Sequence, residues 1–313
     1  MQALRVVSTT DLDRDGWLQA RRQGLGGSEI AAIAGLNPWK SPMAVYLDKI
    51  NELPEQPDNE RMYWGRVLED VVAREFQART GHRVQRVNAV LQHPKYPMLL
   101  ANIDRKVFNK KGNGVLEIKT TGAWNAKEWE EKVPDWVMVQ LQHYLGVLGL
   151  PHGYVAALIG GNQYIQYEIP RDDEVIGYLQ KIALDFWKLV ENKTPPEIDG
   201  SQASADVLDM LYPQSAKGQE VMLPSSALEL IAEYEQAKAD EKAAKERKDA
   251  AANKIKLLMG EGETGKVGNR VATWKSYNRT DLDSKKLKTD MPDIWERYAT
   301  SSSQRRFLIK KEG

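Results

Sequence analysis

The sequence predicts an α/β protein in which helices flank a mixed central sheet. Between residues 20 and 193, segments with helical periodicity alternate with short apolar segments rich in β-branched residues, a mixed order that is typical of helices packed on a sheet. The length of 313 residues allows one large domain or two smaller ones with real cores. From residue 225 to 260 the composition changes to strong helix formers, chiefly Ala, Glu and Lys, which predicts a long helical arm.

Two helices are expected before the first strands. In "SEIAAIAGL" (28–36), Ser28 is a candidate N-cap. In "RVLEDVVAREFQART" (66–80), Gly81 would end the helix. The residues expected on the inner face of this second helix share its apolar stripe: Val67, Val71, Val72 and Phe76.

Five strands and two further helices follow in the sequence. Strands are expected in "HRVQRVNAVLQ" (82–92), "MLLANIDRKVF" (98–108) and "GVLEIKTT" (114–121). A helix is expected in "DWVMVQLQHYLGVLG" (135–149), then two strands in "HGYVAALIGG" (152–161) and "NQYIQYEIP" (162–170). An amphipathic helix (173–193) closes the unit.

The chain is expected to comprise four parts. Residues 1–195 would form the α/β domain, 196–224 a linker rich in Pro, Ser and Asp, 225–260 the helical arm and 261–313 a small β-containing appendage. Residues 253–313 carry 14 basic and 8 acidic side chains. This basic tail either contacts phosphates or forms an ordinary solvated face, and the sequence favours neither.

Composition excludes several classes of protein. The chain contains 44 basic and 44 acidic residues, so no overall charge draws it to nucleic acid or to a membrane. The absence of cysteine excludes disulfides, thiolate metal sites and cysteine nucleophiles. No apolar run is long enough for a signal peptide or a membrane span. We therefore expect a soluble, cytoplasmic protein.

An acid and a lysine lie side by side in the strand "GVLEIKTT". Glu117 and Lys119 share one face of this strand, because successive side chains point to opposite faces. In a hairpin, Asp104 at the end of the preceding apolar strand would approach both of them. Two carboxylates in a small site repel one another unless a cation lies between them, and oxygen ligands of this kind suit Mg²⁺ or Mn²⁺. The group would serve metal-assisted hydrolysis of a phosphodiester, with Glu69 as a third acid.

Structural explanations exist for each of these residues. Glu117 and Lys119 need no function if their strand face is exposed, although Asp104 and Glu117 both interrupt apolar runs, where an unpaired charge is costly. Ser28 would serve equally well as a helix cap. Gln140 lies on an otherwise apolar helix face, and a buried amide needs partners, which favours a role in a site.

Five ordered motifs carry a resemblance to a known family. These are "RRQGLGGSEIAAIAGLNPWKSP", "WGRVLEDVV", "LLANIDRKV", "LEIKTT" and "VQLQHYLGVLG". In this order they resemble the YqaJ branch of the phage alkaline exonucleases, relatives of lambda exonuclease in the PD-(D/E)XK nuclease superfamily. The resemblance covers residues 15–195 and implies that the α/β domain has a restriction-endonuclease-like core.

The resemblance assigns roles to particular residues. It implies that Asp104, Glu117 and the carbonyl of Ile118 bind the metal, that Lys119 is catalytic and that Glu69 positions the attacking water. Gln140 and Tyr144 match a helix that flanks the site, which implies a catalytic role for Gln140 and a contact with DNA for Tyr144. Arg21, Ser28 and Asn102 match positions that contact DNA, the first two at the terminal 5′-phosphate. The sequence departs from the family pattern at Ile103, where proline is usual, and at Asn102, where serine is usual. A second phosphate-binding arginine is not found, although Lys127 lies in the region.

The resemblance also implies a function. It implies a Mg²⁺-dependent double-strand DNA exonuclease that degrades one strand from the 5′ end and leaves a 3′ single strand for recombination. A ring-shaped homotrimer and a single-strand annealing partner of the RecT or Bet kind would accompany it, in the cytoplasm of a bacterial host of phage or prophage. Two alternatives stay open: an endonuclease or nickase with the same residues, and a non-catalytic DNA-binding scaffold for recombination.

Overall fold

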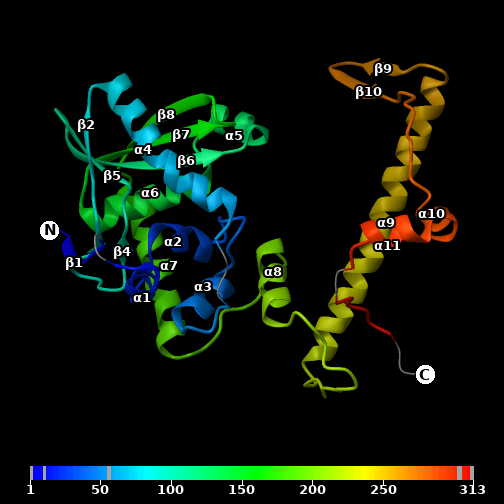
Figure 1. Cartoon of the computed structure of the whole chain (residues 1–313), viewed down its shortest axis with the longest axis horizontal. Helices are drawn as coiled ribbons and strands as arrows, with labels where there is room; N and C mark the ends of the chain where they lie inside the picture. The colour runs from blue at the N-terminus through cyan, green and yellow to red at the C-terminus, as the bar shows by residue number, and fades with distance from the viewer. Residues whose placement is uncertain (1–2, 10–11, 55–57, 302–304, 311–313) are drawn as a thin grey trace. The chain divides into compact units, whose positions relative to one another are not determined.

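The computed structural model describes residues 3–9, 12–54, 58–301 and 305–310. The chain divides into two compact units, the first ending at Tyr212 and the second beginning at Pro213 (Figure 1). None of the helices in the described ranges combines the length and the apolarity that crossing a membrane requires.

A five-stranded mixed sheet forms the centre of the first unit, with the strand order β2-β5-β6-β7-β8. All neighbours are antiparallel except β6 and β7. A parallel pair needs a long crossover connection, which here contains a short 3₁₀ turn, α5 (Ala126–Glu131) and α6 (Asp135–Leu148). The five strands are β2 (Arg83–Arg86), β5 (Arg105–Asn109), β6 (Gly112–Thr121), β7 (His152–Ile159) and β8 (Gln163–Pro170). The sheet flanked by helices is the mixed α/β fold that the sequence predicts.

The two faces of this sheet are covered by different helices, α4 (Glu60–Thr80) and α6 (Figure 1). On β6, the buried side chains of Leu116 and Ile118 pack with Val72 and Phe76 of α4. Val115 instead belongs to the core that contains α6. Because strand residues alternate between faces, Glu117 and Lys119 emerge on the face of α6.

Helices α1 (Arg14–Arg22), α2 (Gly27–Ile33), α3 (Pro42–Lys49), α7 (Asp173–Glu191) and α8 (Gln202–Leu211) complete the first unit with a three-stranded sheet. That sheet has the order β1-β3-β4, formed by Leu4–Ser8, Ala89–Gln92 and Leu100–Ala101. The segment between α1 and α2 joins it, since the Leu25 N–H donates to the Met98 carbonyl at 2.6 Å. A Cβ at Gly24 would lie 2.4 Å from the same carbonyl oxygen, so this close approach requires glycine.

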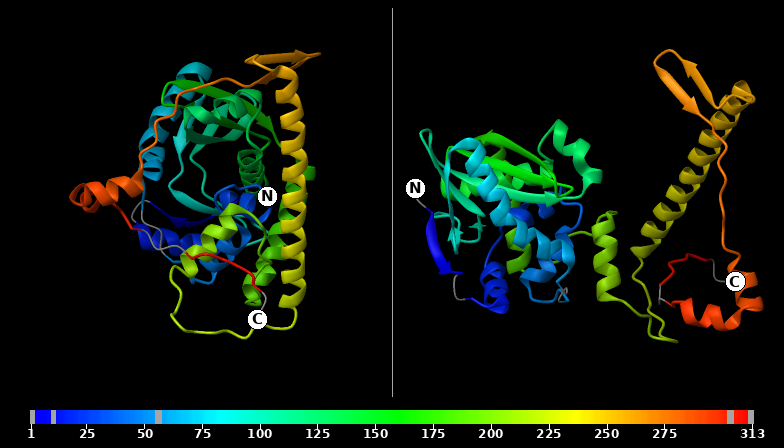
Figure 2. Two further views of the ribbon diagram at one scale, coloured as in Figure 1. Left: turned by 90° about the vertical axis from the view of Figure 1, so that its right-hand side faces the viewer. Right: turned by 45° about the horizontal axis from the view of Figure 1, so that its top comes forward.

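The second unit contains one long helix, α9 (Ala227–Met259), followed by a hairpin of β9 (Thr264–Val267) and β10 (Arg270–Thr273) (Figure 2). Two short helices follow, α10 (Ser284–Asp290) and α11 (Pro292–Tyr298). Phe307 packs edge-to-face on Tyr234 of α9 at a centroid distance of 5.5 Å. The range 196–224, expected to be a linker, contains α8, which belongs to the first unit and buries Ala203 and Val207.

Three expectations for individual elements are wrong. Ser28 lies within the first turn of α2, and the N-cap is Gly26. Val67 and Val71 are 44% and 43% exposed, so they lie outside the buried face of α4 that includes Val72 and Phe76. Helix α4 is longer than expected, and its contact with the sheet is narrower than the apolar stripe.

Two expected strands are each interrupted by a change of sheet. The range 82–92 contains β2 and β3, and the range 98–108 contains β4 and β5, with the members of each pair in different sheets. Asp104 therefore lies immediately before β5 instead of ending one continuous strand. The polar residues Asn88 and Asn102 mark the two points at which the chain leaves one sheet for the other.

Truncation at Phe76 tests the packing of α4. Phe76 is fully buried and contacts Tyr154 edge-to-face at 5.2 Å. We expect Phe76→Ala to lower the free energy of unfolding by about 3–5 kcal/mol, because it leaves a cavity between α4 and the sheet. Val71→Ala on the same helix is the control and should change it by less than about 0.5 kcal/mol. Urea denaturation measures both, and a similar loss in the two variants would contradict this arrangement.

Candidate active site

Asp104, Glu117 and Lys119 converge where β5 begins. The antiparallel register pairs Arg105 with Leu116, which brings Asp104 opposite Glu117. Oδ2 of Asp104 accepts a hydrogen bond from the Ile118 N–H at 2.8 Å. The Lys119 ammonium lies 2.7 Å from Oε1 of Glu117. The three residues predicted from the sequence therefore come together because β5 begins directly after Asp104, while β6 extends beyond it with Glu117 and Lys119.

Gln140 of α6 connects the acid and the lysine. Its Nε2 donates to Oε1 of Glu117 at 2.7 Å, and its Oε1 accepts from Lys119 at 3.0 Å. The same amide group donates to the Tyr144 hydroxyl at 3.1 Å. These partners explain a buried amide on an apolar helix, since both ends of the amide are satisfied. The helix thus fixes the positions of two charged side chains on the strand.

The carboxyl groups of Glu117, which is buried, and Asp104, which is half-buried, repel one another. Burial raises the pKa of Asp104 well above its ordinary value, and the negative charges of Glu117 and Glu69 raise it further, while Lys119 and the Ile118 N–H act in the opposite direction. Burial also raises the pKa of Glu117, against the positive charge of Lys119. One lysine therefore does not compensate for both acids, and a second cation would stabilise their charged forms.

The donor atoms at this place fit a hard divalent cation. Oε2 of Glu117 is buried without a hydrogen-bond partner in the described part of the chain, which is costly for a carboxylate oxygen that binds nothing. The backbone N–H and C=O of one strand residue point to the same lateral side, so the Ile118 carbonyl faces the edge at which Asp104 lies. Two carboxylates and a carbonyl suit Mg²⁺, which retains several waters. This ligand set contains only two carboxylates. Within the described residues there is no group of three or more His, Cys, Asp or Glu side chains that could hold a metal.

Glu69 approaches the acids from α4, on the other face of the sheet. Its Oε1 accepts hydrogen bonds from Arg105 and, at 3.3 Å, from Arg86. Arg105 also binds Asp70 and donates to the Asp104 carbonyl at 2.6 Å. The structure thus places Glu69 within electrostatic range of the predicted metal ligands, with its carboxylate held by two arginines. Sequence reasoning missed Arg105, although a buried charge directly after Asp104 was a visible signal.

Arg21 belongs to a buried charge cluster that the sequence did not reveal. Its guanidinium lies 3.2 Å from Oε1 of Glu29 and 4.7 Å from the ring centre of Trp17. The same Glu29 oxygen lies 2.8 Å from Nζ of Lys49, which donates to the Arg21 carbonyl at 2.9 Å. Oε2 of Glu29 accepts from the Gly26 N–H at 2.6 Å. The cluster orders the whole segment that precedes Ser28.

The segment of the candidate phosphate-binding residues packs directly on α6. A Cβ at Gly27 would lie 2.6 Å from Cγ of Gln140 and 2.9 Å from the ring of Tyr144. Glycine at this position therefore allows α2 to contact α6, whose Gln140 bonds Glu117. Asn102 follows β4, and its Oδ1 is buried without a partner within the described ranges. Lys127 on α5 is exposed and lies 4.0 Å from Glu131.

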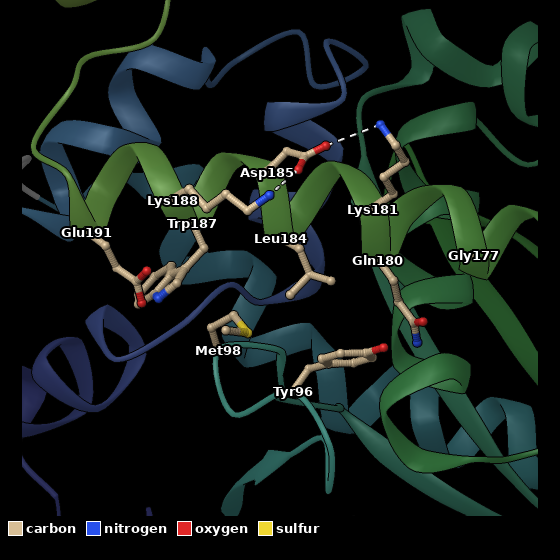
Figure 3. A pocket seen from close by; sticks show the side chains of 10 residues that line it. All are labelled: Tyr96, Met98, Gly177, Gln180, Lys181, Leu184, Asp185, Trp187, Lys188 and Glu191. Carbon is tan, nitrogen blue, oxygen red and sulfur yellow. Dashed lines mark hydrogen bonds and ion pairs between the residues drawn. The ribbon is translucent and has the colours of Figure 1, made fainter.

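Two surface grooves lie elsewhere in the first unit. One, of about 490 Å³, runs between α7 and the turn that carries Tyr96 and Met98 (Figure 3). Its rim carries Asp185, which lies 3.2 Å from Lys181 and 2.8 Å from Lys188. The other, of about 470 Å³, is lined by residues that include Val87, Ile103 and Leu150. Neither groove is lined by Asp104, Glu117 or Lys119.

The first unit is thus a mixed α/β fold in which two acids and a lysine meet beside the central sheet. The YqaJ-like viral recombinase domain matches residues 16–151. A relative from Bacillus subtilis (strain 168), the uncharacterized protein YqaJ, is 40% identical over 311 residues, which cover 98% of this chain and 97% of the relative. The chain therefore belongs to the YqaJ-like viral recombinase family.

Solved structures with related chains include two of the alkaline exonuclease from Laribacter hongkongensis. The first has a TM-score of 0.48 at 20% identity, and the second, a complex with dAMP, has a TM-score of 0.49 at 22% identity. Each similarity covers 57% of this chain and 94% of the solved chain. A phage-related exonuclease from Haemophilus somnus has a TM-score of 0.45 at 11% identity, over 57% of this chain and 98% of its own.

The buried Glu29 makes stability depend on pH. Burial would raise the pKa of Glu29, but the charges of Lys49, Arg21 and Lys40 outweigh it and lower the pKa from 4.5 to about 2. A carboxyl that is more acidic in the folded chain stabilises the fold above pH 4.5 and loses this effect as the pH falls toward about 2. We expect Glu29→Gln to lower the free energy of unfolding by about 3 kcal/mol at pH 7 and by less than half of that at pH 3, measured by urea denaturation.

An exposed pair provides the control for this measurement. Glu75 pairs with Arg79 on α4, and their side chains are 46% and 53% exposed. Glu75→Gln should change stability by less than about 1 kcal/mol at either pH, because solvent screens the pair. Equal losses at pH 7 and pH 3 in Glu29→Gln would show that the charge of Glu29 does not stabilise the fold.

Proposed function

We propose that this protein is a Mg²⁺-dependent exonuclease that degrades one strand of duplex DNA from the 5′ end and leaves a 3′ single strand. One observation carries the proposal: Asp104, Glu117 and Lys119 meet where β5 begins, and one buried oxygen of Glu117 has no partner among the residues that the structure describes. An acid pair beside a lysine is suited to metal-assisted phosphodiester hydrolysis. Membership of a viral recombinase family is consistent with a DNA substrate.

The residues of the site divide the work of the proposed reaction. Asp104, Glu117 and the Ile118 carbonyl would hold Mg²⁺, or Mn²⁺ in its place, which when bound supplies a Lewis acid and lowers the pKa of a water. Lys119 would stabilise charge that develops at the scissile phosphate. Gln140 keeps Lys119 and Glu117 in place through its two hydrogen bonds.

The remaining site residues orient the water and the substrate. Glu69 would orient the attacking water from the α4 side, while Arg105 and Arg86 hold its carboxylate. Arg21 and Ser28 would bind the terminal 5′-phosphate, with Asn102 as a further donor to DNA. Tyr144 supports this region, because its hydroxyl bonds Gln140 and its ring packs on Gly27.

The sequence resemblance supports the wider setting. It extends the proposal to a homotrimeric ring around DNA, a single-strand annealing protein of the RecT or Bet kind that receives the 3′ strand, and the cytoplasm of a host cell that carries a phage or prophage. Strand polarity and preference for an end depend on this resemblance rather than on the geometry of the site.

Replacement of the lysine tests the chemistry. We expect Lys119→Ala to reduce the rate of nucleotide release from linear duplex DNA with Mg²⁺ by at least about 100-fold, because it removes a charge next to the reacting phosphate. Lys111→Ala is the control, since Lys111 is exposed and pairs with Glu168 at 2.7 Å, and it should retain wild-type activity. Undiminished activity in Lys119→Ala would rule out the assigned role. Cleavage of closed circular DNA by the wild type would favour an endonuclease or nickase, and inactivity on every DNA would favour a scaffold.

Replacement of Arg21 tests recognition of the end. We expect the wild type to prefer 5′-phosphate over 5′-hydroxyl duplex, and Arg21→Gln to lower this preference by about 10- to 100-fold because a charge-assisted contact is lost. The adjacent Arg22 pairs with Asp48 at 3.3 Å, and Arg22→Gln should keep the preference. The ratio of initial rates on the two ends measures it. An unchanged ratio in Arg21→Gln would remove Arg21 from the phosphate site.

A further inference from the structure

Trp39 is an exposed indole close to the candidate active site. Its relative exposure is 57%, so much of the aromatic surface of this side chain is open to solvent. The ring contacts Trp136 of α6 edge-to-face at a centroid distance of 5.0 Å. The ammonium of Lys119 lies over the ring of Trp136, 5.1 Å from the ring centre. Trp39 is thus separated from the candidate catalytic lysine by one aromatic ring.

Hydrogen bonds of Asn37 and an ion pair of Lys40 hold the loop that carries Trp39. Oδ1 of Asn37 accepts hydrogen bonds from the backbone N–H groups of Trp39 at 2.8 Å and Lys40 at 3.2 Å. Nδ2 of Asn37 donates to the Ser28 carbonyl at 3.5 Å, and Lys40 pairs with Asp48 at 3.3 Å. The backbone at Trp39 is therefore tied to the residue proposed to contact the terminal 5′-phosphate.

The chemistry of the substrate gives an aromatic ring a role between Ser28, proposed to contact the terminal 5′-phosphate, and Lys119, proposed to contact the scissile phosphate. A terminal nucleotide has its 5′-phosphate on one side of its sugar and the scissile phosphate on the other. Its base must leave the end of the duplex as the scissile phosphate enters the site, which costs stacking energy. A ring that receives the base offsets this cost for any sequence, because every base has an aromatic face.

We propose that Trp39, supported by Trp136, is a stacking site for the base of the terminal nucleotide of duplex DNA. This inference rests on the proposed exonuclease function and assigns one further substrate contact to it. Trp39 binds the base and Trp136 positions both Trp39 and Lys119. The contact is independent of base identity, so it increases affinity for an end without selecting a sequence.

A cycle that combines enzyme variants with substrate variants tests the stacking site. The substrates are linear duplexes with a 5′-phosphate and either an intact terminal nucleotide or an abasic one; a mismatched terminal base controls for the lost base pair. We expect Trp39→Ala to slow release of the first nucleotide at subsaturating enzyme by about 5- to 100-fold on the intact end. On the abasic end, wild type and Trp39→Ala should react at equal rates. Trp39→Phe should stay within about threefold of the wild type because it keeps an aromatic face.

Controls separate stacking from packing. Tyr178 of α7 is exposed to a similar degree, and Tyr178→Ala should behave as the wild type on all substrates. If Trp39→Ala does not fold, the Phe variant and the wild-type ratio between mismatched and abasic ends still decide the question. Equal losses in Trp39→Ala on intact and abasic ends, in an active enzyme, would overturn the stacking site alone. Failure of the wild type to degrade any duplex end would overturn the proposed function and this inference with it.

Discussion

Repulsion between the carboxyl groups of the half-buried Asp104 and the buried Glu117 is the constraint around which the first unit is organised. Burial of two adjacent acids is costly unless each charge is compensated. The surrounding structure supplies Lys119, the amide of Gln140 and the Ile118 N–H. One oxygen of Glu117 still has no partner in the described residues. The fold therefore contains two acids whose negative charge is only partly compensated, and the stability of the fold alone does not explain this arrangement.

The sheet register creates this cluster. Strand β5 begins at Arg105 whereas β6 continues to Thr121 beside β7, so the last residues of β6 have no strand partner on the side of β5. Asp104 takes that place with its side chain, which bonds the Ile118 N–H. The edge of a sheet normally offers backbone groups to water or another strand. Here the edge is closed by a carboxylate.

Much of this site follows from the sequence, because its residues contradict their surroundings. Glu117 and Lys119 interrupt an apolar strand, and Gln140 interrupts an apolar helix; each is explained by contact with the others. Alternation on β6 also predicts correctly which residues share a face. The exposure of Val67 and Val71 was not predictable, since it depends on how far α4 overlaps the sheet. The boundaries between β2 and β3 and between β4 and β5 were missed because a change of sheet leaves only a short polar signal.

The Glu29–Lys49 pair shows the other limit of sequence reasoning. Glu29 lies where a capping acid is expected, three residues after Gly26, so its charge has a local explanation. Its partner comes from the end of α3, and no pattern in the sequence connects the two residues. The expected Ser28 cap was wrong because α2 begins at Gly27. Its N-cap is Gly26, whose N–H donates to the Glu29 side chain.

Arg105 relates the two faces of the sheet to one another. It follows Asp104 in the chain, points to the face of α4 and is buried there between Glu69 and Asp70. Its hydrogen bond to the Asp104 carbonyl joins this cluster to the backbone of the acid on the opposite face. Arg105 therefore connects α4 to the backbone of the residue whose carboxylate closes the edge of β6. Helix α4 therefore contacts the strands of the acids in two ways, through this guanidinium and through the packing of Val72 and Phe76 on Leu116 and Ile118.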